Sequence, residues 1–409
     1  MGEAERAVES VVRESYGRLV SFLAARSGDV SSAEDALSEA LVAALRSWPT
    51  AGIPTQPEAW LLHAARRRVI DQHRSRKLRD EHAESFRSVL EQAEEMANGF
   101  QFPDERLKLL FVCAHPAIDE RVHTPLMLQV VLGLDAAAIA QAFLTPAATM
   151  GQRLSRAKAK IRDTRIAFQV PAGEELAPRL FAVLEAIYAA YNRGWDDVDG
   201  ADEQRRGLTD EAMWLGRLLV ELMPNEPEAL GLLALMHFCE ARRPARRDSK
   251  GEYVPISAQE PRAWSSEHLG AAQLLLARAA RLGRIGRFQL EAAVQAAHCE
   301  RAQTGRTDWP AIALLYEGLV RLAPTVGALL GRAAAAGEAH GAKAGLELLL
   351  QIPESVVAEH QPYWTVRAHL EQRLGRQAES FAHFERALEL TEEPAVRRFL
   401  ERSIRIPQG

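Results

Sequence analysis

Basic side chains crowd one short stretch of this sequence, in which only one acidic residue occurs. From Arg153 to Arg165 there are six Lys and Arg residues against the single acid Asp163. Lys and Arg contact phosphate oxygens, and Arg also binds the acceptor edge of guanine, which is the chemistry of DNA recognition. A charge run is also common on a solvated helix face that binds nothing. The imbalance of charge favours contact with DNA over a solvated face.

Two helices separated by a short turn are needed to position these side chains. Asp135 is a good helix N-cap, and the small and apolar residues after it recur at helical spacing until Thr145-Pro146 ends the helix. Pro146 can also open the next helix. The apolar side of that second helix consists of Met150, Leu154, Ala157 and Ile161. This pattern is typical of a helix-turn-helix, whose second helix enters the major groove.

The polar side of the second helix holds the candidates for DNA contact. We expect these contacts from Thr149, Gln152, Arg153, Ser155, Arg156, Lys158 and Lys160. The amide and guanidinium groups suit base edges, whereas Ser155 and the two lysines suit phosphate. The first turn offers Ala147, Ala148 and Gly151, which have no hydrogen-bonding side chains.

A second basic stripe lies nearer the N-terminus, between Arg66 and Arg79, after a loop that contains three prolines. Stacking on an aromatic ring together with charge on the backbone is how single-stranded DNA is held. The candidates for such contacts are Trp60, Arg66, Arg67, Arg68 and Arg74. The preceding helix is expected to begin at a cap by Ser31 or Ser32 and to stop at Pro49, with an acidic rim outside.

Composition limits what else the chain does. Its 409 residues are rich in Ala, Leu, Arg and Glu, which predicts two or three domains of an all-α fold. Residues 1–170 hold 22 basic and 22 acidic residues, so the net charge of −5 belongs to 171–409. Three scattered cysteines predict neither disulfides nor a metal site. Since phosphate-binding glycine loops and nucleophile motifs are also missing, we expect no cofactor and no enzyme.

Three segments carry a resemblance to a known family. SAEDALSEALVAAL, PEAWLLHAARRRVID and ATMGQRLSRAKAKI follow one another within residues 5–165. In this order they resemble the extracytoplasmic-function (ECF) group of sigma-70-type sigma factors. LKLLFVCAHPAIDE and AFLTPAATMGQRL are similar to the subgroup with a long C-terminal helical extension. The resemblance implies a region 2 domain (1–80), a linker (81–105), a region 4 helix-turn-helix domain (106–170) and a C-terminal extension (171–409).

The resemblance also implies a function and its sites. Such a protein directs core RNA polymerase to promoter DNA and performs no chemistry itself. The region that docks on polymerase would include Glu34, Asp35, Leu37, Ser38 and Glu39. The loop at 52–57 would accept a base flipped out of the −10 element. The arginines Arg66, Arg67, Arg68 and Arg74 would lie along the melted strand. The second helix of the helix-turn-helix would read the −35 element.

Residues 171–409 carry a weak internal repeat. Three segments share one register of small or apolar residues, which is typical of the second helix of tetratricopeptide (TPR) repeats. They are Ala212, Gly216, Leu219 and Pro224; Ile312, Tyr316, Leu319 and Pro324; and Ser380, Phe384 and Ala387. Such arrays bind proteins, so we expect a regulatory domain that contacts either a protein regulator or the sigma domains of the same chain. The basic run from Arg242 to Lys250 is predicted to be a solvated loop.

One alternative of a different class stays open. A protein-interaction scaffold whose sigma-like part no longer binds promoters would also fit, and Ser38, Ala147 and Gly151 are the features that favour it. The N-terminal residues lack the apolar core of a signal peptide, and no apolar run approaches the length of a membrane span. We therefore expect a cytoplasmic protein with no membrane partner.

Overall fold

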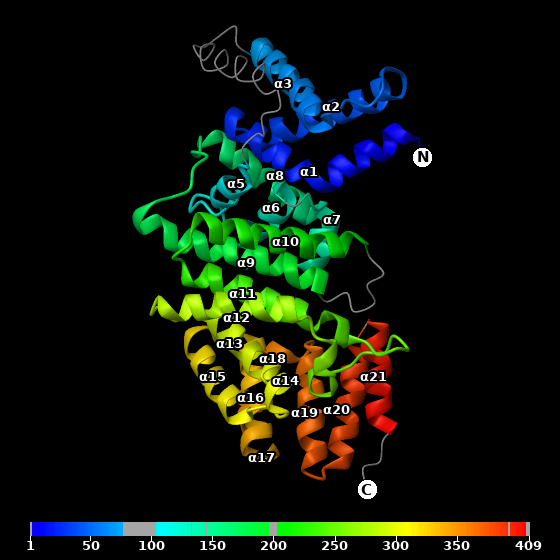
Figure 1. Ribbon diagram of the computed structural model, residues 1–409, viewed down its shortest axis with the longest axis vertical. Helices are drawn as coiled ribbons and strands as arrows, with labels where there is room; N and C mark the ends of the chain where they lie inside the picture. The colour runs from blue at the N-terminus through cyan, green and yellow to red at the C-terminus, as the bar shows by residue number, and fades with distance from the viewer. Residues whose placement is uncertain are drawn as a thin grey trace. The chain divides into compact units, whose positions relative to one another are not determined.

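The computed structural model describes residues 2–76, 104–131, 133–143, 145–195, 203–391 and 393–405. Every regular element in these ranges is a helix, as Figure 1 shows, and the all-α prediction is confirmed. The composition explains this outcome, because Ala, Leu, Arg and Glu all have high helix propensity. Within the same ranges no helix is long and apolar enough to cross a membrane.

The N-terminal helices are mostly longer than ten residues. Helix α2 carries the predicted acidic rim, and α3 carries the second basic stripe as far as Arg76. The elements are α1 (Glu3–Ser27), α2 (Val30–Ala51), α3 (Pro57–Arg76), α5 (Arg106–Cys113), α6 (Glu120–Val130), α7 (Ala136–Ala142), α8 (Ala147–Asp163), a 3-10 turn (Gly173–Glu175), α9 (Leu176–Trp195) and α10 (Glu203–Leu222). The predicted linker falls almost entirely on 77–103, outside the described residues.

The C-terminal helices follow one another with short connections, except for the longer segment 243–265 between α11 and α12. They are α11 (Pro227–Arg242), α12 (Ser266–Arg281), α13 (Arg287–Cys299), α14 (Arg301–Thr304), α15 (Trp309–Leu322), α16 (Val326–His340), α17 (Ala342–Leu349), α18 (Glu354–Val357), α19 (Gln361–Arg373), α20 (Gln377–Glu389) and α21 (Pro394–Arg405). Three 3-10 turns lie between α11 and α12, at Arg243–Arg246, Ile256–Ala258 and Pro261–Ala263.

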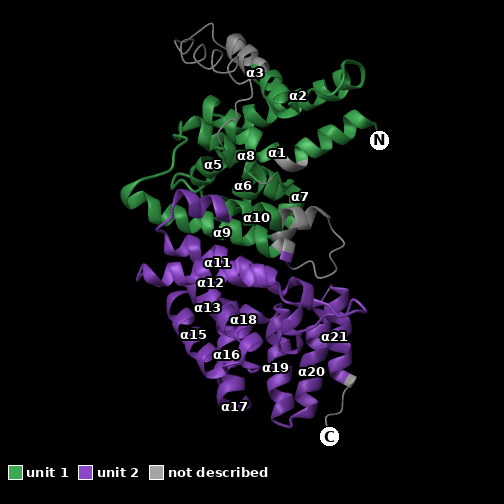
Figure 2. Cartoon of the chain, in the orientation of Figure 1, with its two compact units in different colours: residues 1–194, 207–215 green, residues 195–206, 216–409 purple. Residues whose placement is uncertain are grey.

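The chain divides into two compact units, drawn in different colours in Figure 2. Unit 1 comprises 1–194 and 207–215, and unit 2 comprises 195–206 and 216–409. The division falls later than the domain start predicted at residue 171, because α9 and the middle of α10 pack with the N-terminal helices. Two units are a coarser division than the four predicted domains, which stay a prediction.

The start and end of α2 differ from the prediction. Asp29 caps the helix, since its carboxylate accepts hydrogen bonds from the backbone N–H groups of Ser31 and Ser32 at 3.0 and 3.3 Å. The predicted serine cap was therefore wrong by two or three residues. The helix also continues through Pro49 to Ala51, because a proline in the last turn removes only one backbone hydrogen bond.

Most helical positions of the predicted repeat register are buried, whereas its two prolines, Pro224 and Pro324, are exposed. Ile312 and Leu319 on α15 and Phe384 and Ala387 on α20 are each at most 5% exposed. Adding a Cβ at Gly216 on α10 would bring it within 2.7 Å of Met236 on α11, so the small residue there allows two helices to approach closely. These observations fit the TPR-like prediction, which no comparison below tests.

The basic run from Arg242 to Lys250 is a solvated loop only at its end, where Lys250 is exposed, and its first part is not solvated as predicted. Arg242 is buried at 7% exposure and donates to Gln295 on α13. Arg243 and Arg246 lie over the ring of Trp195, with the guanidinium carbons 5.0 and 4.1 Å from its centroid. The prediction rested on the number of charges alone. It could not include the contact of Arg243 and Arg246 with an aromatic ring about 50 residues earlier in the chain.

Candidate nucleic-acid interface

Helix α8 presents its two sides as the sequence pattern predicts. Its apolar side is buried, and it consists of Met150, Leu154, Ala157 and Ile161. The opposite side is exposed, and it consists of Gln152, Arg153, Ser155, Arg156, Lys160 and Arg162. Thr149 lies half-buried in the first turn. The preceding helix α7 is capped by Asp135, whose carboxylate accepts from the N–H of Ala138 at 2.7 Å. The exposed guanidinium and ammonium groups form a surface on which DNA phosphates can be bound.

Lys158 is the exception on α8. Its ammonium lies 2.7 Å from a carboxylate oxygen of Glu34 on α2, and the two side chains are only 15% and 16% exposed. The structure thus joins a residue predicted to contact DNA with a residue predicted to contact polymerase. Sequence spacing gives no hint of this pair, because 124 residues separate its members.

The other residues predicted on α2 take different positions. Leu37 is fully buried, so it supports the helix rather than its outer surface. Asp35, Ser38 and Glu39 are exposed, and they form an outward-facing patch of one turn. The structure therefore keeps three of the five predicted polymerase-binding residues on the surface and places Glu34 in the ion pair with Lys158.

The aromatic and basic residues of α3 are also brought to different places. Trp60 packs edge-on against the buried Trp48 of α2, with ring centroids 5.5 Å apart. This contact closes the loop between the two helices. Arg66 is 9% exposed, and burial followed by the nearby Arg26 lowers the pKa of its guanidinium. The side chains of Arg67, Arg68 and Arg74 lie outside the described residues.

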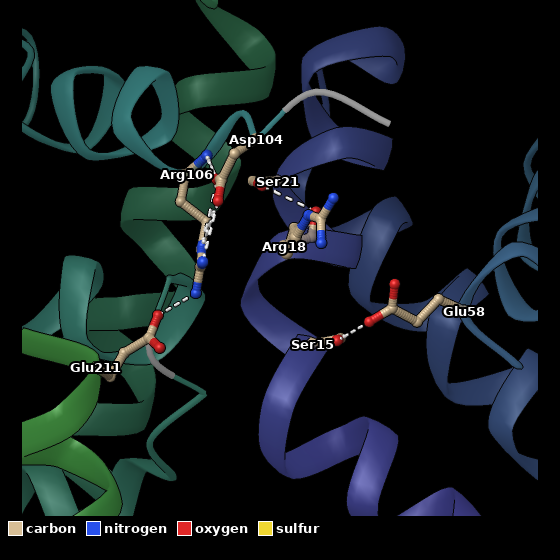
Figure 3. A network of polar contacts seen from close by, with 7 residues as sticks. All are labelled: Ser15, Arg18, Ser21, Glu58, Asp104, Arg106 and Glu211. Atoms are coloured by element: carbon tan, nitrogen blue, oxygen red, sulfur yellow. Dashed lines mark hydrogen bonds and ion pairs between the residues drawn. The ribbon is translucent and has the colours of Figure 1, made fainter. Parts of the chain in front are cut away.

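Arg106 at the start of α5 is a structural residue that the sequence analysis did not single out. Figure 3 shows it between Asp104 and Glu211. Its Nη2 is 3.0 Å from the Asp104 carboxylate, its Nη1 donates to Glu211, and its guanidinium lies 3.6 Å from the ring centroid of Trp214. The side chain is 7% exposed. The available signal was one arginine heading the apolar stretch RLKLLFVC.

Burial affects the acid of this network as well. It raises the pKa of Glu211, whereas the charge of Arg106 and its hydrogen bond act in the opposite direction. Because Glu211 and Trp214 belong to α10, the network ties the first helix after the predicted linker to a helix of the predicted extension, all within unit 1.

Helix α1 approaches α6 so closely that only a glycine fits. A Cβ placed on Gly17 would coincide with the backbone carbonyl of Val131, at the end of α6. One residue earlier, the ring of Tyr16 lies against Gly133, which has a positive φ of 70° and would bring a Cβ within 3.1 Å of that ring. Both glycines therefore allow the N-terminal helices to pack directly on the helices before α8.

Cys113 and His115 do not form a metal site. Cys113 is fully buried, and burial raises the pKa of its thiol. The His115 Nδ1 accepts the N–H of Ala117 at 3.1 Å. In the described part of the chain, no group of three or more His, Cys, Asp and Glu residues is placed to hold a metal ion.

Two segments of the chain match models of protein families. Residues 11–79, which cover most of α1 and all of α2 and α3, match the model of sigma-70 region 2. Residues 179–280 match a family of unknown function, DUF6596. An uncharacterized protein of Rhizobium meliloti (strain 1021) is 36% identical over 363 residues, covering 88% of this chain and 86% of its own. The chain belongs to the same family as that protein. No solved structure matches.

The sigma-70 region 2 match at the N-terminus supports a sigma factor role in transcription initiation. Sigma-70 family proteins are non-enzymatic initiation factors that bind core RNA polymerase and promoter DNA. The resemblance seen in the sequence is thereby confirmed at the level of the sigma-70 family. The DUF6596 match begins within α9 and ends within α12, so it spans the division between the two units.

Proposed function

We propose that this protein is a sigma factor of the ECF type, which directs core RNA polymerase to specific promoters and initiates transcription. The observation that carries the proposal is the exposed basic side of α8, which follows a sigma-70 region 2 in the same chain. Region 2 supplies contacts to polymerase and to the −10 element, and a second basic helix at the end of a helix pair supplies a separate contact to duplex DNA.

On α8, residues with amide or guanidinium groups read bases and the remaining polar residues bind phosphate. The base-reading residues are Gln152, Arg153 and Arg156, and the phosphate-binding residues are Thr149, Ser155 and Lys160. Lys158 joins the second group only when it leaves Glu34. Five of these six residues are exposed in the described structure and Thr149 is half-buried, which supports this division.

In region 2, the exposed patch of Asp35, Ser38 and Glu39 docks on polymerase, and the buried Leu37 holds that turn in place. The loop at 52–56, which Trp60 closes by packing on Trp48, receives a flipped base. Arg67, Arg68 and Arg74 follow the melted strand, whereas the buried Arg66 has a supporting role. Phosphate and stacking contacts offset the few kcal/mol that base flipping costs.

The helices of unit 2 regulate the sigma part, either by binding a protein regulator or by contact with the sigma domains. The buried helical positions of the repeat register on α10, α15 and α20 support a TPR-like fold, which is an architecture that binds proteins. A cavity of about 540 Å³ among α15, α16 and α17 offers one surface for such a partner. It is lined by residues including Leu314, Glu317, Arg332, His340 and Leu348.

The domain divisions at 80, 105 and 170 are part of this proposal, with one change. The helix-turn-helix domain is completed by α9 and by the middle of α10, because these pack within unit 1. Since RNA polymerase works in the cytoplasm, we place the protein there.

Runoff transcription tests the proposed function. Core polymerase of the source organism is combined with the full-length protein and a library of its genomic fragments. Specific transcripts that depend on the added protein establish a sigma factor. A full-length protein with Asp35→Arg and Glu39→Arg should lose polymerase binding, whereas Glu174→Arg and Glu120→Arg, on exposed sites elsewhere in unit 1, should not. No transcripts and no polymerase binding by the unmodified protein would favour the protein-interaction scaffold.

A further inference from the structure

The consecutive helices α15, α16 and α17 line a cavity of about 540 Å³ within unit 2. Glycines let these helices approach one another closely. A Cβ on Gly345 of α17 would lie 2.8 Å from the Cα of Gly337 on α16, and a Cβ on Gly331 would overlap the ring of Tyr316 on α15. Short side chains line the hollow beside these contacts, namely Ala313, Ala336 and Ala344. The cavity therefore results from close backbone packing combined with alanines that are too short to fill the space.

One charged side chain of this cavity is poorly satisfied by the rest of the chain. Arg332 on α16 is only 16% exposed, and its Nε is buried with no hydrogen-bond partner among the described residues. The carboxylate of Glu317 is 3.9 Å from its Nη1, which is beyond hydrogen-bond distance. A guanidinium has five N–H donors, and a buried donor without an acceptor costs free energy. Arg332 therefore holds at least one donor beside the cavity that the described chain does not satisfy.

Arg287 on α13 is a satisfied arginine of the same burial. Its side chain is also 16% exposed, but its Nε lies 2.7 Å from the carboxylate of Glu291. By contrast, a pair held at 3.9 Å contributes little, so Glu317 can give way to another acid at small cost. A carboxylate supplied by a ligand would account for the position of Arg332, because a guanidinium binds a carboxylate through two parallel hydrogen bonds.

The edge of the cavity is apolar and open to solvent. Leu314 on α15 is 74% exposed, and Leu348 on α17 is half-buried. A pocket for a small molecule usually encloses most of its ligand, whereas an exposed apolar edge is typical of a surface that another protein covers. Because Arg332 is far less exposed than Leu314, a carboxylate must reach it on an extended arm. A glutamate side chain provides that arm, whereas a C-terminal carboxylate is attached directly to the backbone.

We propose that this cavity binds a segment of a partner protein in which a glutamate is flanked by aliphatic residues. The glutamate carboxylate binds the guanidinium of Arg332, and the aliphatic side chains cover Leu314 and Leu348. The proposal states the chemistry of the regulator that unit 2 binds, and it rests on the proposed function for that regulatory role. Binding of the segment itself requires neither polymerase nor DNA.

Replacement of Arg332 separates a binding role from a structural one. Arg332→Met removes a poorly satisfied charge and keeps a long side chain, so the free full-length protein should melt at the same temperature or a higher one. Arg287→Met removes a hydrogen-bonded guanidinium of equal burial and should melt at a lower temperature. Differential scanning calorimetry gives the comparison. A melting temperature for Arg332→Met clearly below that of the unmodified protein would show that Arg332 serves the fold, and would overturn the proposal.

Peptide selection tests the ligand. Short random peptides are displayed in two forms, one within a longer chain and one with a free C-terminus, and both are selected on the full-length protein. Peptides recovered from the first form should share a glutamate beside Leu, Ile or Val. Replacing that glutamate by glutamine should weaken binding about tenfold or more in fluorescence polarisation, because a hydrogen-bonded charge is lost. Recovery of the free C-terminal form alone, or of peptides without a shared carboxylate, would overturn the proposal.

Variants of the protein locate the binding site. Arg332→Met and Leu314→Ser should each weaken binding of a recovered peptide about tenfold. Leu322→Ser and Arg321→Met are matched controls and should not, because both residues are exposed on α15 and neither lines the cavity. Equal binding by all four variants would place the peptide elsewhere and overturn the proposal. Failure of the sigma assignment is distinguishable, since it would abolish runoff transcripts and leave peptide binding intact, whereas failure of the cavity would leave the transcripts.

Discussion

The charged side chains of α8 face different partners, and the position of each residue on the helix decides whether it faces solvent or α2. Arg153 is exposed, whereas Lys158, five residues later, has turned toward α2. A five-residue step rotates the side chain by about 140° around an α-helix, so the two cannot face the same partner. Sequence analysis could assign both to a basic face, but only the structure separates them.

Replacement of Arg153 tests the base-reading task. Arg153→Ala should weaken binding to the cognate promoter by about 1–3 kcal/mol and relax selectivity at one base pair, because a bidentate contact to a base edge is lost. Promoter titrations with the polymerase complex measure both effects. Arg121→Ala, on the exposed start of α6, is the control and should change neither. Unchanged affinity and selectivity for Arg153→Ala would remove it from the base-reading set.

Arg106 joins α5 to α10 within unit 1, so its replacement should lower the stability of that unit. Arg106→Met should lower the free energy of unfolding by roughly 2–4 kcal/mol, since it leaves Asp104 and the partly buried Glu211 without their cation. Urea unfolding followed by tryptophan fluorescence measures the change in unit 1. The control Arg121→Met removes an exposed guanidinium and should cost well under 1 kcal/mol. Equal midpoints for the two variants would contradict a stabilising network.

His298 on α13 should make unit 2 sensitive to acid. Burial, with Arg242 and Arg301 nearby, lowers the pKa of His298 to about 4 from the ordinary 6.5. The unfolded chain then binds the proton more readily, so stability is lost as the pH falls from about 6.5 to about 4, by up to about 3 kcal/mol from this residue.

The variant His298→Phe keeps an aromatic ring against Trp309, whose centroid is 5.4 Å away, and removes the titrating group. Chemical unfolding at pH 7.0 and pH 4.5 should show a smaller loss of stability for the variant than for the unmodified protein. The same loss in both would show that His298 does not carry the acid sensitivity of unit 2.

At the scale of elements, the local sequence pattern predicted the amphipathic helices. It did not predict the contacts between segments that are far apart in the sequence. The four residues predicted for the buried side of α8 are all buried, and Asp135 caps α7 as expected. These signals lie within a few residues of each other. The Lys158–Glu34 pair, the Arg106 network and the Trp195 ring over Arg246 each join distant segments, so no periodicity reveals them.

The N-cap of α2 is Asp29 and not Ser31 or Ser32, and substitutions at these positions test the assignment. Asp29→Ala should cost about 1 kcal/mol, because the carboxylate satisfies two backbone N–H groups that the first turn leaves open. Ser31→Ala, at the position that the sequence suggested, should cost a few tenths of this. Thermal unfolding of the two variants gives the comparison. A larger loss for Ser31→Ala would restore the serine cap.

At the scale of the whole molecule, the division between the two compact units falls later in the chain than the domain start predicted at residue 171. The resemblance implied that start after Val170, and a 3-10 turn begins close by, at Gly173. The helices beyond it nevertheless belong partly to unit 1. A local break in the chain shows where a helix ends, whereas burial decides which helices share a core.

Truncation distinguishes the two boundaries. A fragment of residues 1–170 should unfold at a lower temperature and aggregate more readily than a fragment of residues 1–222, because it lacks α9, Glu211 and Trp214. Differential scanning calorimetry and light scattering measure the two properties. The full-length chain provides the reference for unit 1. Identical melting of both fragments would mean that residues 171–222 add nothing to the N-terminal core.

The Arg106 network also bears on how such a protein can change over generations. The guanidinium belongs to Arg106, the first residue of α5, whereas the Glu211 carboxylate and the Trp214 ring come from the part that matches DUF6596. Recombination between those two gene segments would combine Arg106 with a segment that lacks an acidic residue at position 211. We therefore expect relatives to replace residues 106, 211 and 214 as a set, so that the two halves of the gene descend together.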